Sequence, residues 1–219
     1  MTMNTYAGIQ ANVRKWTVTD TSVVADSDIT DMLPQVESEI YAQLRLPEMR
    51  SYYTWAYLAG GLDIASIDGG LIIQPISVIV QISSSDFRSP VPASEAVVRS
   101  RMQTSDTNNP SVVGWLSEAD GTAKLVISPE PVGKTITLSY WRQFATLSGT
   151  TNLAFLAYPN IWLNGLLRDA FLLQQDIDMF NLYSQRFTES IAVANQLARG
   201  KNEALQGNTT AALFDTWKP

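Results

Sequence analysis

The sequence of 219 residues contains no cysteine and no histidine. Without cysteine, thiolate nucleophiles, disulfide frameworks and cysteine-rich zinc sites are excluded. Without histidine, the chain lacks the commonest general base and the commonest ligand of transition metals. Ser-His-Asp triads and HExxH zinc sites are therefore excluded as well. Carboxylates, lysines, tyrosines and hydroxyls remain, and their pattern predicts no catalytic residue, no metal site and no cofactor.

Positive charge is also scarce, because 15 lysines and arginines face 21 acidic residues, for a net charge of −6. Sequence-independent binding to DNA needs clustered cations, and here they are scattered. The longest apolar run, residues 70–82, is broken by Gln74, Pro75 and Gln81, so we expect no membrane span. The first residues do not resemble a signal peptide. We predict a soluble protein made inside a cell.

Residues 1–49 have the pattern of two helices. A loop rich in Thr, Ser and Asp is expected over residues 17–31, and the second helix is expected from near Asp31 to Leu46. Pro34 fits the first turn of that helix, where its missing N–H costs nothing. The apolar positions of the first helix recur at spacings of three and four: Tyr6, Ile9, Val13 and Trp16.

Residues 50–147 change to the composition of β-strands. Two short apolar segments, Val112–Leu116 and Lys124–Ile127, flank an Asp-Gly pair and predict a hairpin. Thr135–Tyr140 predicts a further strand, because apolar and polar residues alternate along it. The polar stretch of residues 83–109 is expected to be a long connection containing a short helix.

Residues 148–200 are again helical in pattern. Pro159 is expected to open one helix, and Gly200 is expected to end the last one. The two helices are expected to pack on one another through residues at helical spacing. The first helix carries Trp162, Leu166, Asp169, Ala170 and Leu173, and the second aligns Phe180, Tyr183, Phe187, Ile191, Ala194 and Leu197. Residues 201–219 then predict an extended tail. Its three large apolar side chains are more than a solvated tail needs, so we predict that they dock on a partner: Leu213, Phe214 and Trp217.

The fold class that follows is α+β. A helical bundle made by the N-terminal and C-terminal helices would carry a β-rich insertion and end in the extended C-terminal tail.

One strand places three aromatic side chains on the same face, namely Tyr53, Trp55 and Tyr57. Such a face is most often buried in a core or between subunits, because aromatic side chains gain much free energy from burial. The alternative is a platform on which sugar rings stack.

Three motifs partly match known chemical sites, but a structural role explains each of them better. Gly133-Lys134-Thr135 lacks the earlier glycine and the following helix of a phosphate-binding loop, so a turn is expected. Four residues match positions of a calcium loop, but Asp31 replaces its glycine and Pro34 interrupts it: Asp26, Asp28, Thr30 and Glu37. Several carboxylates that a hydrolase could use lie beside turn residues: Asp63, Asp68, Asp86, Glu118 and Asp120.

Five segments occur in a recognisable order, from the first helix through the Pro-x-Pro strand end to the helix that opens with proline: Tyr6–Trp16, Leu33–Arg45, Lys124–Pro131, Ile136–Trp141 and Tyr158–Leu167. In this order they resemble the head-to-tail adaptor (connector) proteins of short-tailed bacteriophages. The similarity spans most of residues 5–200, and the chain differs from the family in its C-terminal residues.

This resemblance implies a structural virion protein that is not an enzyme. It implies a homo-oligomer, a twelvefold ring in the neck between the portal protein and the tail nozzle or tail tube. Genomic DNA would pass through the lumen without sequence-specific binding and be retained there after packaging. Two other interpretations remain: a carbohydrate-binding or host-recognition module that uses the aromatic strand face, and a small carboxylate hydrolase.

Overall fold

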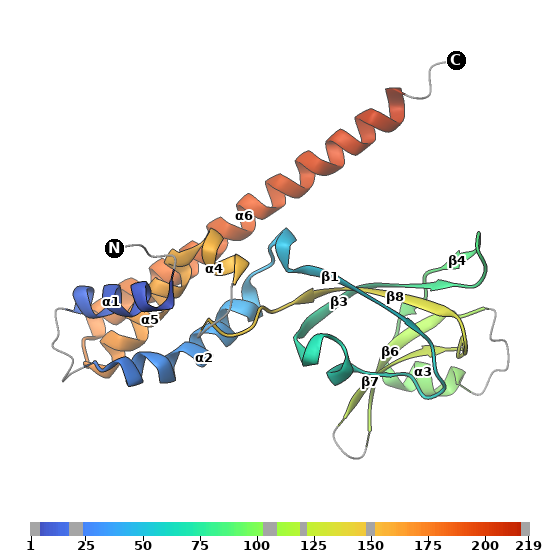
Figure 1. Ribbon diagram of the computed structural model, residues 1–219, viewed down its shortest axis with the longest axis horizontal. Helices are drawn as coiled ribbons and strands as arrows, with labels where there is room; N and C mark the ends of the chain where they lie inside the picture. The colour runs from blue at the N-terminus through green and yellow to red at the C-terminus, as the bar shows by residue number, and fades with distance from the viewer. Residues whose placement is uncertain (1–4, 18–23, 103–108, 119–121, 148–151, 216–219) are drawn as a thin grey trace. The chain divides into compact units, whose positions relative to one another are not determined.

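The computed structural model describes residues 5–17, 24–102, 109–118, 122–147 and 152–215, with side chains described up to residue 200 (Figure 1). The chain divides into two compact units. The helical unit contains residues 1–49 and 144–219, and the β unit contains residues 50–143. The predicted mixture of α and β structure is confirmed.

The helical unit begins with α1 (Tyr6–Thr17), whose buried face differs by one position from the predicted one. Ile9 and Val13 are buried as expected, and Thr17 continues their row. Trp16 was predicted to lie on this face, but 53% of its side chain is exposed. The small Thr17 fits the face because its hydroxyl donates to the carbonyls of Val13 and Arg14 at 3.0 and 3.1 Å. A polar side chain can be buried when it is hydrogen-bonded in this way.

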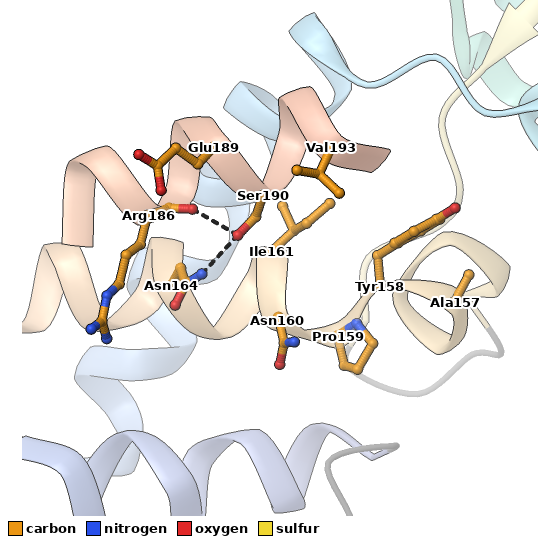
Figure 2. Close-up of a pocket in the computed structure, with 10 residues that line it drawn as sticks. All are labelled: Ala157, Tyr158, Pro159, Asn160, Ile161, Asn164, Arg186, Glu189, Ser190 and Val193. Atoms are coloured by element: carbon orange, nitrogen blue, oxygen red, sulfur yellow. Dashed lines mark hydrogen bonds between the residues drawn. The ribbon is translucent and has the colours of Figure 1, made fainter. Parts of the chain in front are cut away.

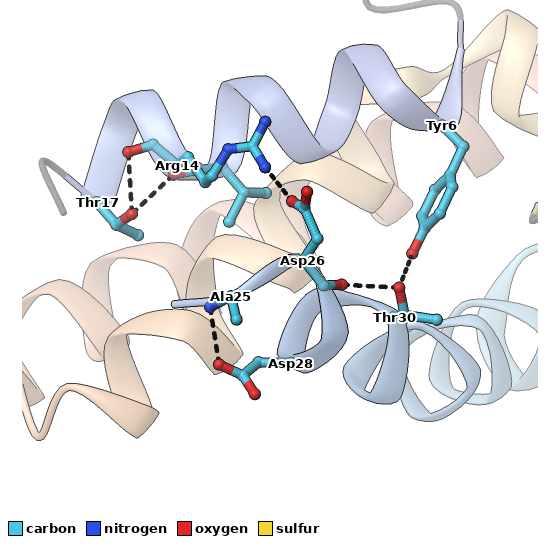
Figure 3. Close-up of polar contacts among 8 residues, drawn as sticks. Tyr6, Arg14, Thr17, Ala25, Asp26, Asp28 and Thr30 are labelled. Atoms are coloured by element: carbon cyan, nitrogen blue, oxygen red, sulfur yellow. Dashed lines mark hydrogen bonds and ion pairs between the residues drawn. The ribbon is translucent and has the colours of Figure 1, made fainter. Parts of the chain in front are cut away.

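Helix α2 (Asp26–Gln43) begins before the predicted start at Asp31, within the stretch expected to be a loop. Asp28 Oδ2 accepts a hydrogen bond from the backbone N–H of Ala25 at 2.8 Å, which stabilises this earlier start (Figure 3). Pro34 therefore lies inside the helix and not in its first turn. Its ring is exposed.

The second half of the helical unit contains α4 (Leu153–Ala157), α5 (Pro159–Leu173) and α6 (Ile177–Asp215). Pro159 opens α5 as predicted. Of the predicted stripe on α6, Phe180 is half-buried and Leu197 is 54% exposed, and Ala198 continues the buried row in place of Leu197. The buried α6 side chains are Tyr183, Phe187, Ile191, Ala194 and Ala198.

The end of α6 contradicts the predicted extended tail. The helix does not stop at Gly200 but continues to Asp215. An exposed glycine inside a helix costs only about 1 kcal/mol relative to alanine. The following Lys, Glu, Ala, Leu and Gln residues favour helix, so a single glycine does not end it.

The β unit contains two four-stranded sheets, ordered β1-β8-β3-β4 and β2-β7-β6-β5. The predicted hairpin is confirmed as the antiparallel pair of β6 and β7, and the predicted strand at Thr135 as β8. The predicted short helix is α3 (Glu95–Arg101), and 3-10 turns lie at Ile64–Ser66 and Asp68–Gly70. A further 3-10 turn, Pro47–Met49, ends the first part of the helical unit. The strands are β1 (Arg50–Ala56), β2 (Leu62–Asp63), β3 (Ile72–Gln81), β4 (Phe87–Arg88), β5 (Val91–Pro92), β6 (Val112–Ser117), β7 (Ala123–Ser128) and β8 (Thr135–Arg142).

The core of the β unit lies between its sheets. The alternation predicted along β8 is confirmed, because Ile136, Leu138 and Tyr140 are all fully buried. Tyr57 joins the two sheets: its hydroxyl accepts from the N–H of Ile127 at 3.1 Å and lies 3.4 Å from the carbonyl of the same residue. Burial raises the pKa of Tyr57 to about 12, so the phenol stays neutral and can donate.

Gly165 of α5 generates the first prediction, because the helices approach one another closely there. A Cβ at this position would lie 2.6 Å from Val36 Cγ1 and 3.1 Å from Phe187 Cε2. We expect Gly165→Ala to lower the free energy of unfolding by about 1–3 kcal/mol through overpacking, although alanine favours helix.

Gly200→Ala is the control, since a Cβ there meets nothing within 4 Å. It should raise the stability of α6 by about 0.5–1 kcal/mol. Urea denaturation followed by circular dichroism would measure both, and equal effects would contradict the close approach.

Candidate functional site

A buried carboxylate connects three segments of the helical unit. Glu37 on α2 is 4% exposed. Its Oε1 accepts from the backbone N–H of Leu147 at 3.1 Å and from Trp162 Nε1 at 3.3 Å. Burial raises the pKa of Glu37, and these hydrogen bonds oppose the rise. The carboxylate therefore holds the segment that returns from the β unit, and α5, against α2.

A second buried polar contact, between Tyr41 and Asn152, lies one turn further along α2. Tyr41 accepts a hydrogen bond from Asn152 Nδ2 at 2.7 Å, and Asn152 Oδ1 accepts from the N–H of Phe155 at 3.0 Å. Asn152 thus caps α4 and fixes it to α2 at the same time. Burial raises the pKa of Tyr41 to about 12.

Arg168 on α5 forms the third polar connection, to α2. Its guanidinium donates to both carboxylate oxygens of Glu39, at 2.6 and 3.1 Å, and to Asp169 at 2.7 Å. Burial alone would lower the pKa of Arg168, but the two carboxylates outweigh it and raise that pKa. The same guanidinium lies 5.0 Å from the ring centroid of Phe187 on α6, so Arg168 contacts three helices. These connections rigidify the unit and leave its surface free to bind.

The rigid helices frame a groove of about 380 Å³ between the start of α5 and α6 (Figure 2). Asn164 Nδ2 donates to Ser190 Oγ at 2.9 Å, and Ser190 Oγ donates to the carbonyl of Arg186 at 2.7 Å. Its remaining lining is largely apolar, with one cation and one carboxylate: Ala157, Tyr158, Pro159, Asn160, Ile161, Arg186, Glu189 and Val193. A groove of this composition can receive a protein segment.

Large apolar side chains are exposed at one end of the helical unit, where α1 and α5 end and α2 and α6 begin (Figure 1). Leu172, Leu173 and Ile177, at the turn between α5 and α6, are 50%, 52% and 57% exposed. Trp16, at the end of α1, is 53% exposed. An ion pair between Arg14 and Asp26 holds the end of α1 on the start of α2 (Figure 3). At the opposite end of α1, Tyr6 donates to Thr30 Oγ1 of α2 at 2.9 Å. Exposed apolar residues that gather on a rigid element mark interaction sites.

Sequence reasoning missed this surface, since Leu173 was expected on the packed face of its helix. The sequence offered no local signal for it, because adjacent apolar residues elsewhere in α5, such as Leu166 and Leu167, are both buried.

The aromatic strand face predicted from the sequence lies toward the core of the β unit. Tyr57 belongs to that core, and Tyr53 and Trp55 are half-buried and pack against it. Their role as an interface stays a prediction. Of the predicted tail anchors, Leu213 and Phe214 lie in α6 with side chains outside the described part, and Trp217 lies outside the described residues.

The other candidate motifs have structural roles. Gly133 lies in the turn before β8, where its N–H donates to the carbonyl of Tyr57, and a strand follows it. Of the calcium-loop residues, Asp28 caps α2 and Glu37 is buried. Within the described ranges, no three carboxylates gather as a metal site requires. Asp120 lies outside those ranges, and the other proposed hydrolase carboxylates have local partners: Asp63 with Ala65, Asp68 with Arg142, Asp86 with Arg88 and Glu118 with Lys124.

Comparison with family models matches residues 4–210 to the SU10 adaptor protein family. The chain belongs to this family. The resemblance to phage head-to-tail adaptors found in the sequence is thereby confirmed. No curated protein matches the chain.

Membership of the SU10 adaptor family makes this chain a phage adaptor, and such adaptors are structural proteins, not a class of enzymes. It also implies a virion component that contacts other head or tail proteins. Among the helices in the described ranges, none combines the length and apolar character needed to cross a membrane. In an adaptor, the exposed groove and the apolar end of the helical unit are candidate docking surfaces.

The buried carboxylate of the adaptor generates a pH-dependent prediction. Because the pKa of Glu37 is raised in the folded state, the native protein binds a proton more readily than the unfolded chain does. Wild-type stability relative to Glu37→Gln should therefore increase as the pH falls through the folded pKa, and level off below the unfolded value of 4.5. At pH 7 Glu37→Gln should be at least as stable as wild type, since the amide oxygen still accepts.

Glu37→Ala is the contrasting variant, because it leaves two buried donors without an acceptor. It should lower the free energy of unfolding by about 1–3 kcal/mol for each donor. Denaturation midpoints measured between pH 4 and 8 test both variants. A wild-type protein that gains stability over Glu37→Gln as the pH rises would show that ionisation of Glu37 is favoured by folding.

Proposed function

We propose that this chain is the head-to-tail adaptor of a phage virion and forms a ring between the portal protein and the tail. The ring is twelvefold. It binds the portal on one side and the tail nozzle or tail tube on the other. The genome passes through its lumen and is retained there after packaging.

The observation that carries this proposal is the match of residues 4–210 to an adaptor family. It covers both units, so it concerns the whole chain and not a shared helical motif. The net charge of −6 supports the passage of DNA, because a chain with few and scattered cations makes few nonspecific contacts with the phosphate backbone.

The helical unit supplies the rigid docking surfaces that an adaptor needs. Leu172, Leu173 and Ile177 expose about half of each side chain to solvent at one end of the unit, and burying them against a partner would stabilise the complex. The C-terminal residues supply a second contact, in which the anchors are Leu213 and Phe214 at the end of α6 and Trp217 after it. A long helix that continues to Asp215 suits this role, because it can reach a neighbouring protein.

The alternative function, a carbohydrate-binding or host-recognition module, depends on the face of Tyr53, Trp55 and Tyr57. A stacking platform requires exposed rings, and Tyr57 is 0% exposed. The position of these rings against the core therefore favours the adaptor.

The function is tested by removing the gene from its phage and supplying the chain from a plasmid. Without the chain, we expect filled heads that lack tails and lose their DNA, because the portal is left unsealed. Electron microscopy and nuclease sensitivity of the packaged DNA measure both effects. Tailed particles that retain DNA but do not adsorb to cells would instead indicate host recognition.

The same complementation tests the end of α6. A chain that ends at Gly200 keeps every side chain of α6 that is buried within the described part of the chain, so it should fold and melt as the full chain does. It should nevertheless fail to restore tailed particles, because the three anchors are missing. Restoration by the truncated chain, at the level of the full chain, would remove the anchors from the proposal.

A further inference from the structure

The edges of the two sheets in the β unit are not equally protected. An edge strand presents unpaired N–H and C=O groups, and natural proteins block such edges with proline, bulges or very short strands. Sheet edges β2, β4 and β5 are each two residues long. The part of β3 that β4 leaves uncovered contains Pro75 and two irregularities in register.

Strand β1 has none of these protections. It is seven residues long, contains no proline, and pairs with β8 in an uninterrupted register from Arg50↔Trp141 to Ala56↔Thr135. Arg50, at its first position, is its only charged residue. On its other side β1 has no neighbouring strand in the described chain. A bare edge of this length would aggregate unless a partner covers it.

The direction of the β1 backbone follows from the hydrogen bonds next to it. Tyr57 donates its N–H to the carbonyl of Lys134 and accepts from the N–H of Gly133, so its backbone groups point toward β8. Successive residues of a strand alternate in direction. The N–H and C=O groups of Tyr52, Thr54 and Ala56 therefore point toward the open edge. Within the described part of the chain, these three residues form no further backbone hydrogen bond.

We propose that β1 pairs antiparallel with β1 of a second copy of this chain, with Thr54 opposite Thr54 across a two-fold axis. In this register Tyr52 lies opposite Ala56 of the second copy. The outward groups of each copy then meet those of the other, which gives about six backbone hydrogen bonds. The β1-β8-β3-β4 sheets of the two copies then form one continuous sheet.

The side chains of β1 are complementary to themselves in this register. On the exposed face, the largest residue, Tyr52, lies beside the smallest, Ala56 of the second copy. Thr54 is hydrogen-bonded to Thr137 at 3.2 Å, so a row of four threonines would cross the two-fold axis. On the other face, half-buried Tyr53 would lie opposite half-buried Trp55 of the second copy. This pairing gives two of the predicted interface residues a partner.

A two-fold contact closes on itself and cannot build a cyclic ring. The dimer is therefore a form of the free protein, in which β1 is covered before the adaptor joins a virion. The inference goes beyond the proposed function and does not depend on it, because it concerns the chain without any partner.

The absence of cysteine makes the register directly testable, since each variant then carries one thiol. In Thr54→Cys the two Cα atoms would lie about 5.5 Å apart, within the range of a disulfide. Mild oxidation should convert this variant to a covalent dimer. Thr137→Cys is the matched control, because it lies in the same row of the same face but on the central strand β8. Tyr52→Cys tests the register, because two copies of residue 52 would be too far apart.

The predicted result is a dimer for Thr54→Cys, with Thr137→Cys and Tyr52→Cys remaining monomeric on non-reducing gels. Failure of Thr54→Cys to cross-link, or equal cross-linking of Thr137→Cys, would overturn the proposal. Portal binding is measured separately, so a failed dimer leaves the adaptor function untouched.

A second measurement needs no covalent bond. In sedimentation equilibrium, wild type should rise with concentration from 24.2 kDa toward twice that mass. Thr54→Pro should stay monomeric with an unchanged melting temperature, because the lost N–H points away from β8 and β1 tolerates proline there. If Thr54→Pro unfolds, Thr54→Lys replaces it, with Ile79→Lys on β3 as the control that still dimerises. A wild type that remains monomeric, or a Thr54 variant that dimerises as wild type does, would contradict β1 pairing.

Discussion

The helical unit depends on one buried carboxylate. Glu37 bonds to Leu147 and Trp162, which lie 110 and 125 residues away in the sequence. The chain leaves this unit at residue 49 and re-enters it at residue 144, after the whole β unit. Ordering such a distant return costs conformational entropy, which hydrophobic contacts alone would offset without fixing a unique register. A hydrogen-bonded carboxylate adds the direction that apolar packing lacks, because its acceptors require donors at defined positions.

This connection also determines which surfaces remain for binding. Asn152 and Arg168 extend it along α2, and together they fix α4, α5 and α6. The apolar side chains left exposed, at the turn between α5 and α6, are therefore carried on a rigid frame. A rigid frame lowers the entropy that a partner must overcome on binding, and this suits a protein whose role is to join two others.

Much of the fold follows from local patterns in the sequence. The β6–β7 hairpin, the alternation along β8 and the buried stripe of α6 from Tyr183 to Ala194 were predicted because each depends on neighbouring residues alone. The start of α2 was predicted too late, because its cap is an Asp28 side chain that bonds to the backbone and leaves no apolar pattern. Gly200 was taken as a stop, but its cost is small beside the helix-forming residues that follow.

The docking surfaces were harder to predict for a physical reason. Exposure of Trp16, Leu172 and Leu173 is decided by tertiary packing, and the same residues would be core in another arrangement. Glu37 was considered only as a calcium ligand, since a sequence does not reveal that Leu147 and Trp162 converge on it. The open edge of β1 likewise depends on strand order, which long-range pairing determines.

The adaptor function is tested most directly by solution mass, measured by light scattering for the chain alone and with the assembled portal protein of its own phage. The account predicts a free chain no larger than a dimer, which becomes a stoichiometric twelvefold layer when the portal is added. An assembled portal whose mass does not change on addition of the chain would contradict the adaptor function.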